Sequence, residues 1–145
     1  MGTPIGLVFD CADPPRLGAF WAGVLGYVER PPPAGFASWA AYDTANGVSD
    51  DEANAGFALV DPGGTGPTVF FQRVPEPKAT KNRVHVDVRA SHGLPPGGPA
   101  AREAIEDRTR ALVDAGATLL YRSPHPDDDY FVTLADPEGN EFCVV

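Results

Sequence analysis

A histidine and an aspartate two residues apart, His85 and Asp87, have the clearest capacity for chemistry in this chain. An imidazole gives and takes protons near neutral pH, and a neighbouring carboxylate can strengthen its hold on the proton or act as a base itself. Residues two apart on a strand share one face of the sheet. The pair therefore predicts a general acid–base site. The alternative is that both side chains are hydrogen-bonded residues at the rim of a sheet.

Other polar side chains fall on predicted strands, where alternation turns them toward one side of the sheet. Asp10 shares a face with Gly6 in the first strand, and Glu141 shares one with Cys143 in the last. Gln72 lies in a Phe-Phe-Gln run whose orientation the sequence leaves ambiguous. We expect Asp10, Gln72, Glu141 and Cys143 to contact a bound ligand.

Aromatic residues on predicted strands add surface on which a flat molecule could stack. Trp39, Phe70 and Tyr130 are the ones that we expect to contact such a ligand. Two acidic runs, 50–52 and 127–129, are either solvated turns or the surroundings of the opening. In the second case they would favour a cationic ligand.

The elements that must position these residues occur in two similar rounds. Short apolar segments between turn residues predict strands at 5–11, 36–42, 55–60, 68–74, 83–89, 118–122, 130–134 and 141–145. Apolar stripes predict helices over 14–25 and 100–115, and the polar segment 44–53 is expected to connect strands. The order β-α-β-β-β thus occurs twice. Repetition of one such unit predicts an α+β fold in which two curved sheets surround a cleft.

Composition narrows the class of protein. The length of 145 residues suits one domain, 1–145, with modules at about 3–75 and 82–145 and a connector at 75–81. A net charge of −9 disfavours nucleic acid as a partner, and no apolar run of about 18 residues predicts a membrane span. The two cysteines lack zinc-site spacing, and no signal peptide is visible, so we expect free buried thiols in a reducing cytoplasm.

Three segments carry a family resemblance. The run L-A-D-P-E-G-N-E-F-C-V-V at 134–145 resembles the terminal hairpin of the vicinal oxygen chelate superfamily, which includes glyoxalase I, bleomycin resistance proteins and extradiol dioxygenases. The run D-C-A-D-P-P-R-L-G-A-F-W-A-G-V-L-G-Y at 10–27 resembles the strand–helix entry of that family. The run R-V-P-E-P-K at 73–78 is similar to a segment of short glyoxalase-like domains. The resemblance covers nearly the whole chain.

The resemblance implies two βαβββ modules around a cleft, and a homodimer. It also marks the positions at which metal-dependent members carry ligands, which here hold Gly6, Gln72, His85 and Cys143. Glycine has no ligand atom in a side chain, and Cys143 stands where a carboxylate is expected. A catalytic site generally needs three protein ligands. We therefore expect no catalytic metal and no other cofactor.

Three functions remain open as hypotheses. The first is a metal-free protein that binds a small, aromatic organic molecule, of the bleomycin-resistance kind. The second is a lyase or isomerase in which His85 is the general acid–base, Asp87 its partner, and Cys143 or Gln72 a polar contact. The third is an interaction module whose cleft is filled. Convergence of His85 and Asp87 within hydrogen-bond reach, around an empty space, is the feature that distinguishes the second hypothesis from the others.

Overall fold

The computed structural model describes residues 2–124 and 130–145, which divide into two compact units at Pro77 and Lys78. The acidic run 127–129 lies outside the described residues. Each unit has one four-stranded sheet. None of the described helices is long and apolar enough to traverse a bilayer.

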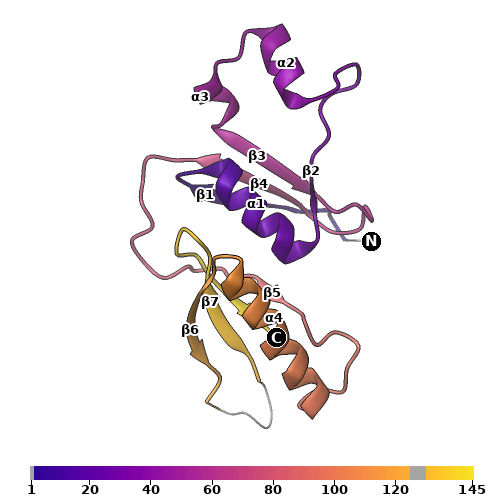
Figure 1. Cartoon of the computed structure of the whole chain (residues 1–145), viewed down its shortest axis with the longest axis vertical. Helices are drawn as coiled ribbons and strands as arrows, with labels where there is room; N and C mark the ends of the chain where they lie inside the picture. The colour runs from indigo at the N-terminus through magenta and orange to yellow at the C-terminus, as the bar shows by residue number, and fades with distance from the viewer. Residues whose placement is uncertain (1, 125–129) are drawn as a thin grey trace. The chain divides into compact units, whose positions relative to one another are not determined.

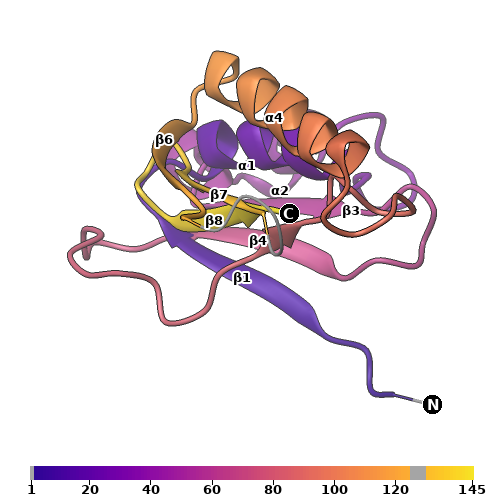
Figure 2. The ribbon, with the colours of Figure 1, turned by 90° about the horizontal axis from the view of Figure 1, so that it is seen from below.

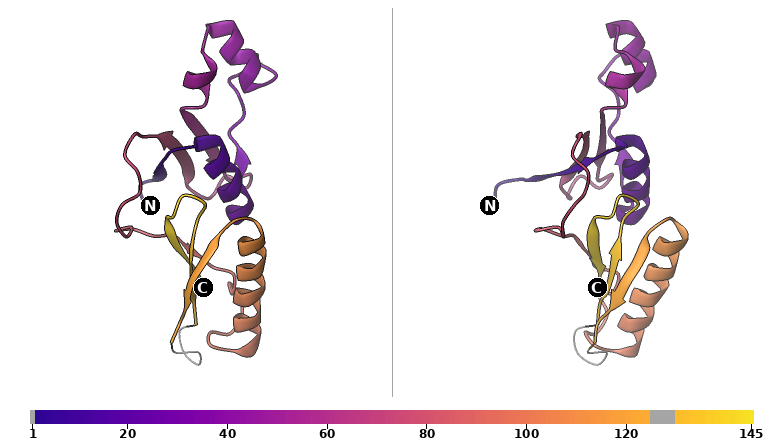
Figure 3. Two further views of the ribbon diagram at one scale, coloured as in Figure 1. Left: turned by 60° about the vertical axis from the view of Figure 1, so that its left-hand side comes forward. Right: turned by 90° about the vertical axis from the view of Figure 1, so that its left-hand side faces the viewer.

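Unit 1 combines a mixed sheet with one long and two short helices. Its strands are β1 (Gly6–Cys11), β2 (Val28–Glu29), β3 (Gly56–Val60) and β4 (Thr68–Arg73), and its helices are α1 (Pro14–Leu25), α2 (Trp39–Asn46) and α3 (Asp50–Ala53). The sheet order is β1-β4-β3-β2, with β1 parallel to β4 and the other pairs antiparallel. Figure 1 shows α1 lying along the sheet, and Figure 3 shows α2 and α3 beyond the ends of its strands.

The core of unit 1 forms between α1 and the sheet. The helix begins where the Asp13 carboxylate accepts a hydrogen bond from the Arg16 N–H (3.1 Å), and it ends at Gly26, whose φ of 68° suits glycine. Its predicted apolar stripe is buried, and the Trp21 ring lies 4.9 Å from the Phe9 ring of β1. The stripe therefore closes one face of the sheet and leaves the other for Asp10 and its neighbours.

Unit 2 repeats this arrangement. Its elements are β5 (Asp87–Val88), α4 (Pro99–Asp114), β6 (Thr118–Arg122), β7 (Val132–Ala135) and β8 (Glu141–Val144). The sheet order is β5-β8-β7-β6, with β5 parallel to β8 and the other pairs antiparallel. Figure 2 shows α4 along one face of β7 and β8. That face holds the fully buried side chains Val132, Leu134, Phe142 and Val144, and α4 supplies Ala101, Ile105 and Leu112.

The α+β fold built from paired, similarly ordered halves is confirmed. The cleft between the halves stays a prediction. Both cysteines are free and buried, as expected.

The predicted strand at 36–42 is wrong, because this segment enters a helix. The Ser38 hydroxyl accepts a hydrogen bond from the Ala41 N–H (3.1 Å), which starts α2 at Trp39. The strand that pairs with β3 is the short β2. The polar segment 44–53 is also helical in part, since a capping box between Ser49 and Glu52 starts α3. Short-range capping outweighed the aromatic content that suggested a strand.

The strand predicted at 83–89 is mostly irregular. Only Asp87 and Val88 are assigned to β5, and Val84 is 81% exposed instead of packing beneath a helix. Pairing with β8 starts late, because the first bond here runs from the Cys143 N–H to the Val86 carbonyl (3.0 Å). Before Val86 the described segment is held not by ladder bonds but by contacts such as the hydrogen bond from the Asn82 N–H to the Glu141 carboxylate (2.9 Å).

Candidate functional site

The described part of unit 2 brings His85, Asp87 and Cys143 together on one face of its sheet. Asp87 and Cys143 are direct register partners in the parallel pair β5–β8, so their side chains project to the same side. The His85 Nε2 lies 3.2 Å from the Asp87 Oδ1. One donor atom from each of the three residues lies within 4.8 Å of the others. The predicted acid–base pair is thus in contact, with a thiol beside it.

Exposure differs within this cluster. The side chains of His85 and Asp87 are 43% and 52% exposed, whereas Cys143 is 9% exposed. The Cys143 Sγ lies 3.4 Å from the Thr133 hydroxyl on the adjacent strand β7. A ligand can therefore reach the imidazole and carboxylate directly, and the thiol forms the floor beneath them. Thr133 was not foreseen, since only the β7–β8 pairing brings it to Cys143.

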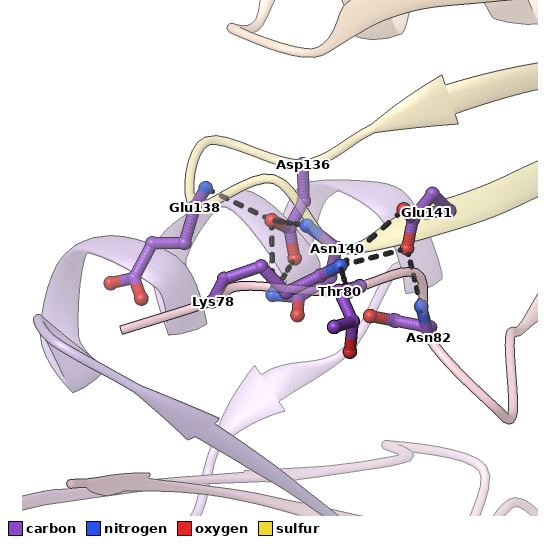
Figure 4. A network of polar contacts seen from close by, with 7 residues as sticks. All are labelled: Lys78, Thr80, Asn82, Asp136, Glu138, Asn140 and Glu141. Carbon is purple, nitrogen blue, oxygen red and sulfur yellow. Dashed lines mark hydrogen bonds and ion pairs between the residues drawn. The ribbon is translucent and has the colours of Figure 1, made fainter. Parts of the chain in front are cut away.

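Glu141 lies on the same strand as Cys143, but protein groups already engage its carboxylate. The carboxylate accepts a hydrogen bond from the Asn82 N–H (2.9 Å) and forms an ion pair with the Lys78 Nζ (3.1 Å), as Figure 4 shows. The hydrogen bond from the Asn82 N–H is the largest cause that lowers the pKa of Glu141 to about 2; the backbone of Glu141 itself and then Lys78 lower it further. Glu141 therefore fastens the segment that precedes His85 to the start of β8.

The turn before β8 is held by a buried carboxylate. The Asp136 Oδ1 accepts hydrogen bonds from the N–H groups of Glu138 and Asn140, each at 2.9 Å (Figure 4). Gly139 in this turn has a φ of 87°, which glycine adopts without strain. This turn sets where β8 begins, and so where Cys143 meets Asp87.

In unit 1, Asp10, Gln72 and Phe70 share the face of the sheet opposite α1. The Gln72 Nε2 donates a hydrogen bond to the Asp10 Oδ1 (2.8 Å), and the two residues are register partners in β1–β4. Phe70 is 39% exposed, while Phe71 is fully buried, which resolves the ambiguous Phe-Phe-Gln run. A Cβ at Gly56 would lie only 2.8 Å from the Phe70 ring, so this ring can lie over β3 because that position is a glycine.

Two predicted ligand contacts, Trp39 and Tyr130, lie outside the His85 cluster in the described structure. Trp39 lies on α2, where its indole N–H donates to the Arg30 carbonyl (2.7 Å) and its ring packs against Tyr42. The Tyr130 hydroxyl donates to Glu106 of α4, which places Tyr130 on the helix side of the unit 2 sheet. Thr133, three residues on, contacts Cys143 on the other side. Tyr130 is therefore on the opposite side of the sheet from the His85 cluster.

The donor types at the cluster allow a test of the metal that the resemblance associates with this position. Imidazole, carboxylate and thiolate are zinc ligands, and three protein ligands leave a fourth position open. In a tetrahedron with zinc bond lengths, ligand atoms are about 3.3–3.8 Å apart. The donor atoms of His85, Asp87 and Cys143 lie within 4.8 Å of one another, so side-chain adjustments would be needed to bring all three to that spacing. The set fits a borderline-soft divalent ion better than a hard ion such as Mn²⁺, which prefers oxygen ligands.

Comparisons with known proteins agree with the fold. The family model described as "Glyoxalase-like domain" matches residues 6–145. No curated protein matches the chain.

Several solved structures share the architecture at low sequence identity. A possible glyoxalase from Bacillus cereus matches with a TM-score of 0.62 and 14% identity, covering 100% of this chain and 99% of that one. A glyoxalase/bleomycin resistance protein/dioxygenase family enzyme from Burkholderia phytofirmans PsJN matches at 0.56 and 20% identity, covering 95% and 93%. The fosfomycin resistance protein FosX of Listeria monocytogenes, a mutant in complex with Mn(II) and a dihydroxypropylphosphonic acid, matches at 0.62 and 9% identity, covering 99% and 89%.

Proposed function

Because this chain belongs to the glyoxalase-like domain family, whose model matches residues 6–145, we propose that it transfers a proton on a small organic molecule bound at His85, Asp87 and Cys143. The observation that carries the proposal is the 3.2 Å contact between the His85 Nε2 and the Asp87 Oδ1, with Cys143 beside it. A purely binding protein has no need of an imidazole held by a carboxylate at an accessible position. The reaction class is that of a lyase or isomerase.

The contact assigns a task to each nitrogen of His85. With Asp87 3.2 Å from its Nε2, the imidazole would carry its proton on that nitrogen, which leaves the Nδ1 lone pair to take a proton from the substrate. The imidazolium that forms is stabilised by the Asp87 carboxylate and returns the proton to a second atom of the substrate. The protonation state of the enzyme is thereby restored. The Cys143 thiol supplies a polar contact beneath the reacting group.

The experiment measures exchange of carbon-bound hydrogen. The protein is incubated in D₂O with a panel of small α-hydroxy and α-keto carbonyl compounds, and the loss of the substrate ¹H signal is followed by NMR. We expect exchange above the uncatalysed rate for at least one compound, and His85→Asn should lower that rate about 10²–10⁴-fold. His92→Asn is the control, because His92 lies in the loop before α4 and outside the cluster. Exchange that survives in His85→Asn, or that no compound elicits, contradicts the proposal.

A second candidate function is a metal centre formed by the same three residues. It is favoured by the approach of three donor atoms to within 4.8 Å. When bound, a zinc-like ion would act as a Lewis acid toward an oxygen of the ligand. His85, Asp87 and Cys143 would hold it.

Cobalt(II) is a suitable probe for the metal candidate, because thiolate coordination produces a strong absorption band. The band should appear on addition of the ion and disappear in Cys143→Ser. Cys11→Ser, which removes the other buried thiol, should retain it. A band that is absent, or unchanged in Cys143→Ser, excludes the metal candidate and leaves the proton-transfer proposal untouched.

A further inference from the structure

Unit 2 contains a second concave site, on the helix side of its sheet. Its volume is about 320 Å³, and it is bounded by the loop 91–98, the first turns of α4 and the end of the chain. The Ser91 N–H donates to the Val145 carbonyl (3.1 Å), which ties the loop to the residue after β8. Tyr130 and Ile105 form part of its wall. Because Tyr130 faces away from Cys143, this pocket is separate from the proton-transfer site.

Three basic side chains line the pocket: Arg89, His92 and Arg102. Among residues 2–124 and 130–145, none of the three forms an ion pair. The Arg102 guanidinium lies 4.7 Å from the centroid of the Tyr130 ring, so a cation–π contact fixes its place at the wall. Glu106, the acidic residue that contacts Tyr130, is itself engaged by Arg122. The ionisable side chains that contribute charge to the described lining are therefore basic, although the chain as a whole carries −9.

The start of α4 adds positive charge to this pocket. Gly98, the N-cap residue, lines the pocket and supplies no side-chain hydrogen bond to the first turn. The N-terminus of a helix carries a partial positive charge, which is favourable for an anion. The arginines carry the argument for an anionic ligand, and the helix strengthens it.

Part of the remaining lining is apolar. Leu94, Ala101, Ile105 and the Tyr130 ring supply hydrocarbon surface, and Ile105 is 3% exposed. A volume of about 320 Å³ lies at the small end of the range for ligand pockets. Such a pocket accommodates one ring and a short acidic group. A planar guanidinium recognises a carboxylate through paired hydrogen bonds.

We propose that this pocket binds a small monocarboxylate that carries a single apolar ring, with Arg102 and Arg89 holding the carboxylate and Ile105 and Tyr130 contacting the ring. The proposal does not depend on the proton-transfer function, because the two sites lie on opposite sides of the sheet and share no residue. A chain with both sites would bind two ligands of different kinds.

The two isoleucines of the chain provide a direct test. Ile105 lies in the pocket wall, and Ile5 precedes β1 in unit 1, so methyl-labelled isoleucine gives one reporter signal and one internal reference. The full chain is titrated with benzoate, with its neutral analogue benzamide, and with acetate, which lacks the ring. We expect a saturable shift of the Ile105 methyl at millimolar benzoate and no shift of Ile5. Benzamide and acetate should each bind at least about tenfold more weakly.

Variants identify the groups that hold the carboxylate. Arg102→Met keeps the apolar part of the side chain and should weaken benzoate binding about tenfold. If this variant does not fold, Arg89→Met serves as the second variant. The matched control is Arg110→Met, since Arg110 lies on α4, pairs with Asp107 and is absent from the pocket lining. Equal affinities for benzoate and benzamide overturn the proposal. So does benzoate binding that both pocket variants leave unchanged, or tighter binding of inorganic phosphate than of benzoate.

Discussion

The two units of this chain share a strand order but carry different chemistry at matching positions. In each, the first strand runs parallel to the last, and an aspartate on the open face pairs in register with a polar residue of that last strand. In unit 1 this pair is Asp10 with Gln72, and in unit 2 it is Asp87 with Cys143. The residue two positions before the aspartate is Val8 in unit 1 and His85 in unit 2.

This difference changes what each face can do. In unit 1 the carboxylate of Asp10 is occupied by the amide of Gln72 (2.8 Å), and its neighbours Val8 and Phe70 are apolar. An amide neither takes nor releases a proton near neutral pH. In unit 2 the carboxylate contacts an imidazole, which does both. The same backbone arrangement thus carries amide and apolar groups in unit 1, which can only contact a ligand. In unit 2 it carries an imidazole and a carboxylate, which are groups that can transfer a proton.

The largest effect is expected when unit 2 is given the side chain of unit 1. His85→Val copies Val8 and should lower the rate of proton exchange about 10²–10⁴-fold, because it removes the imidazole that takes and returns the proton. Its midpoint of thermal unfolding should remain close to that of the parent, since the His85 side chain is 43% exposed. If the variant loses activity only because it unfolds, the loss does not show that His85 accounts for the difference between the two units.

Matched core truncations ask whether the two units unfold as one. Phe71→Ala in unit 1 and Phe142→Ala in unit 2 each remove a ring that is fully buried, and each should cost about 3–5 kcal/mol. Amide hydrogen exchange should show the loss of protection in the unit that carries the change. Equal loss in both units from either variant would mean that they unfold as a single cooperative body.

Acid should destabilise unit 2 through its paired glutamates. The pKa of Glu106 is lowered to about 2, first by the hydrogen bond from Arg122, and the pKa of Glu141 is lowered to about 2. Because both values lie below the unfolded value of 4.5, the unfolded chain binds more protons, and the stabilisation present above pH 4.5 is lost as the pH falls toward 2.

Each of these glutamates is expected to contribute on the order of 1 kcal/mol, since their side chains are 22% and 18% exposed. Denaturant midpoints measured between pH 6 and pH 3, at roughly half-unit steps, follow this loss. The change of the denaturant midpoint per pH unit should be smaller in the variant Glu106→Gln than in the parent. An unchanged slope in that variant would mean that other carboxylates govern the acid response.

The smallest effect concerns the starts of the two long helices. In α1 the Asp13 carboxylate caps the first turn, whereas the N-cap of α4 is Gly98, which has no side chain to do so. Asp13→Ala should therefore cost about 1 kcal/mol. Chemical denaturation detects a change of this size, and Asp13→Asn, which keeps a capping oxygen, should recover most of it.

Local pattern predicted much of the fold because its signals are short-range. The apolar stripe from Leu17 to Leu25 predicted α1, and the run at 134–145 that resembles a terminal hairpin forms one. The segment 36–42 failed because aromatic residues occur in strands and helices alike, and the Ser38 cap decided for a helix in which no residue is buried. The segment 83–89 failed in part because an edge strand needs a partner, and pairing with β8 begins only at Val86.

The sequence by itself predicted that His85 and Asp87 would share a face, since residues two apart on an extended chain do so, and their side chains are in contact although His85 lies before β5. It also determined that a buried thiol would follow the terminal turn. Only the tertiary structure decided that this thiol lies beside Asp87. It also decided that Lys78 and Asn82 hold the Glu141 carboxylate. Finally, it placed Tyr130 on the face of the unit 2 sheet that α4 covers. These contacts join residues far apart along the chain, and the parallel pairing of β5 with β8 that creates the first of them leaves no local signal in the sequence.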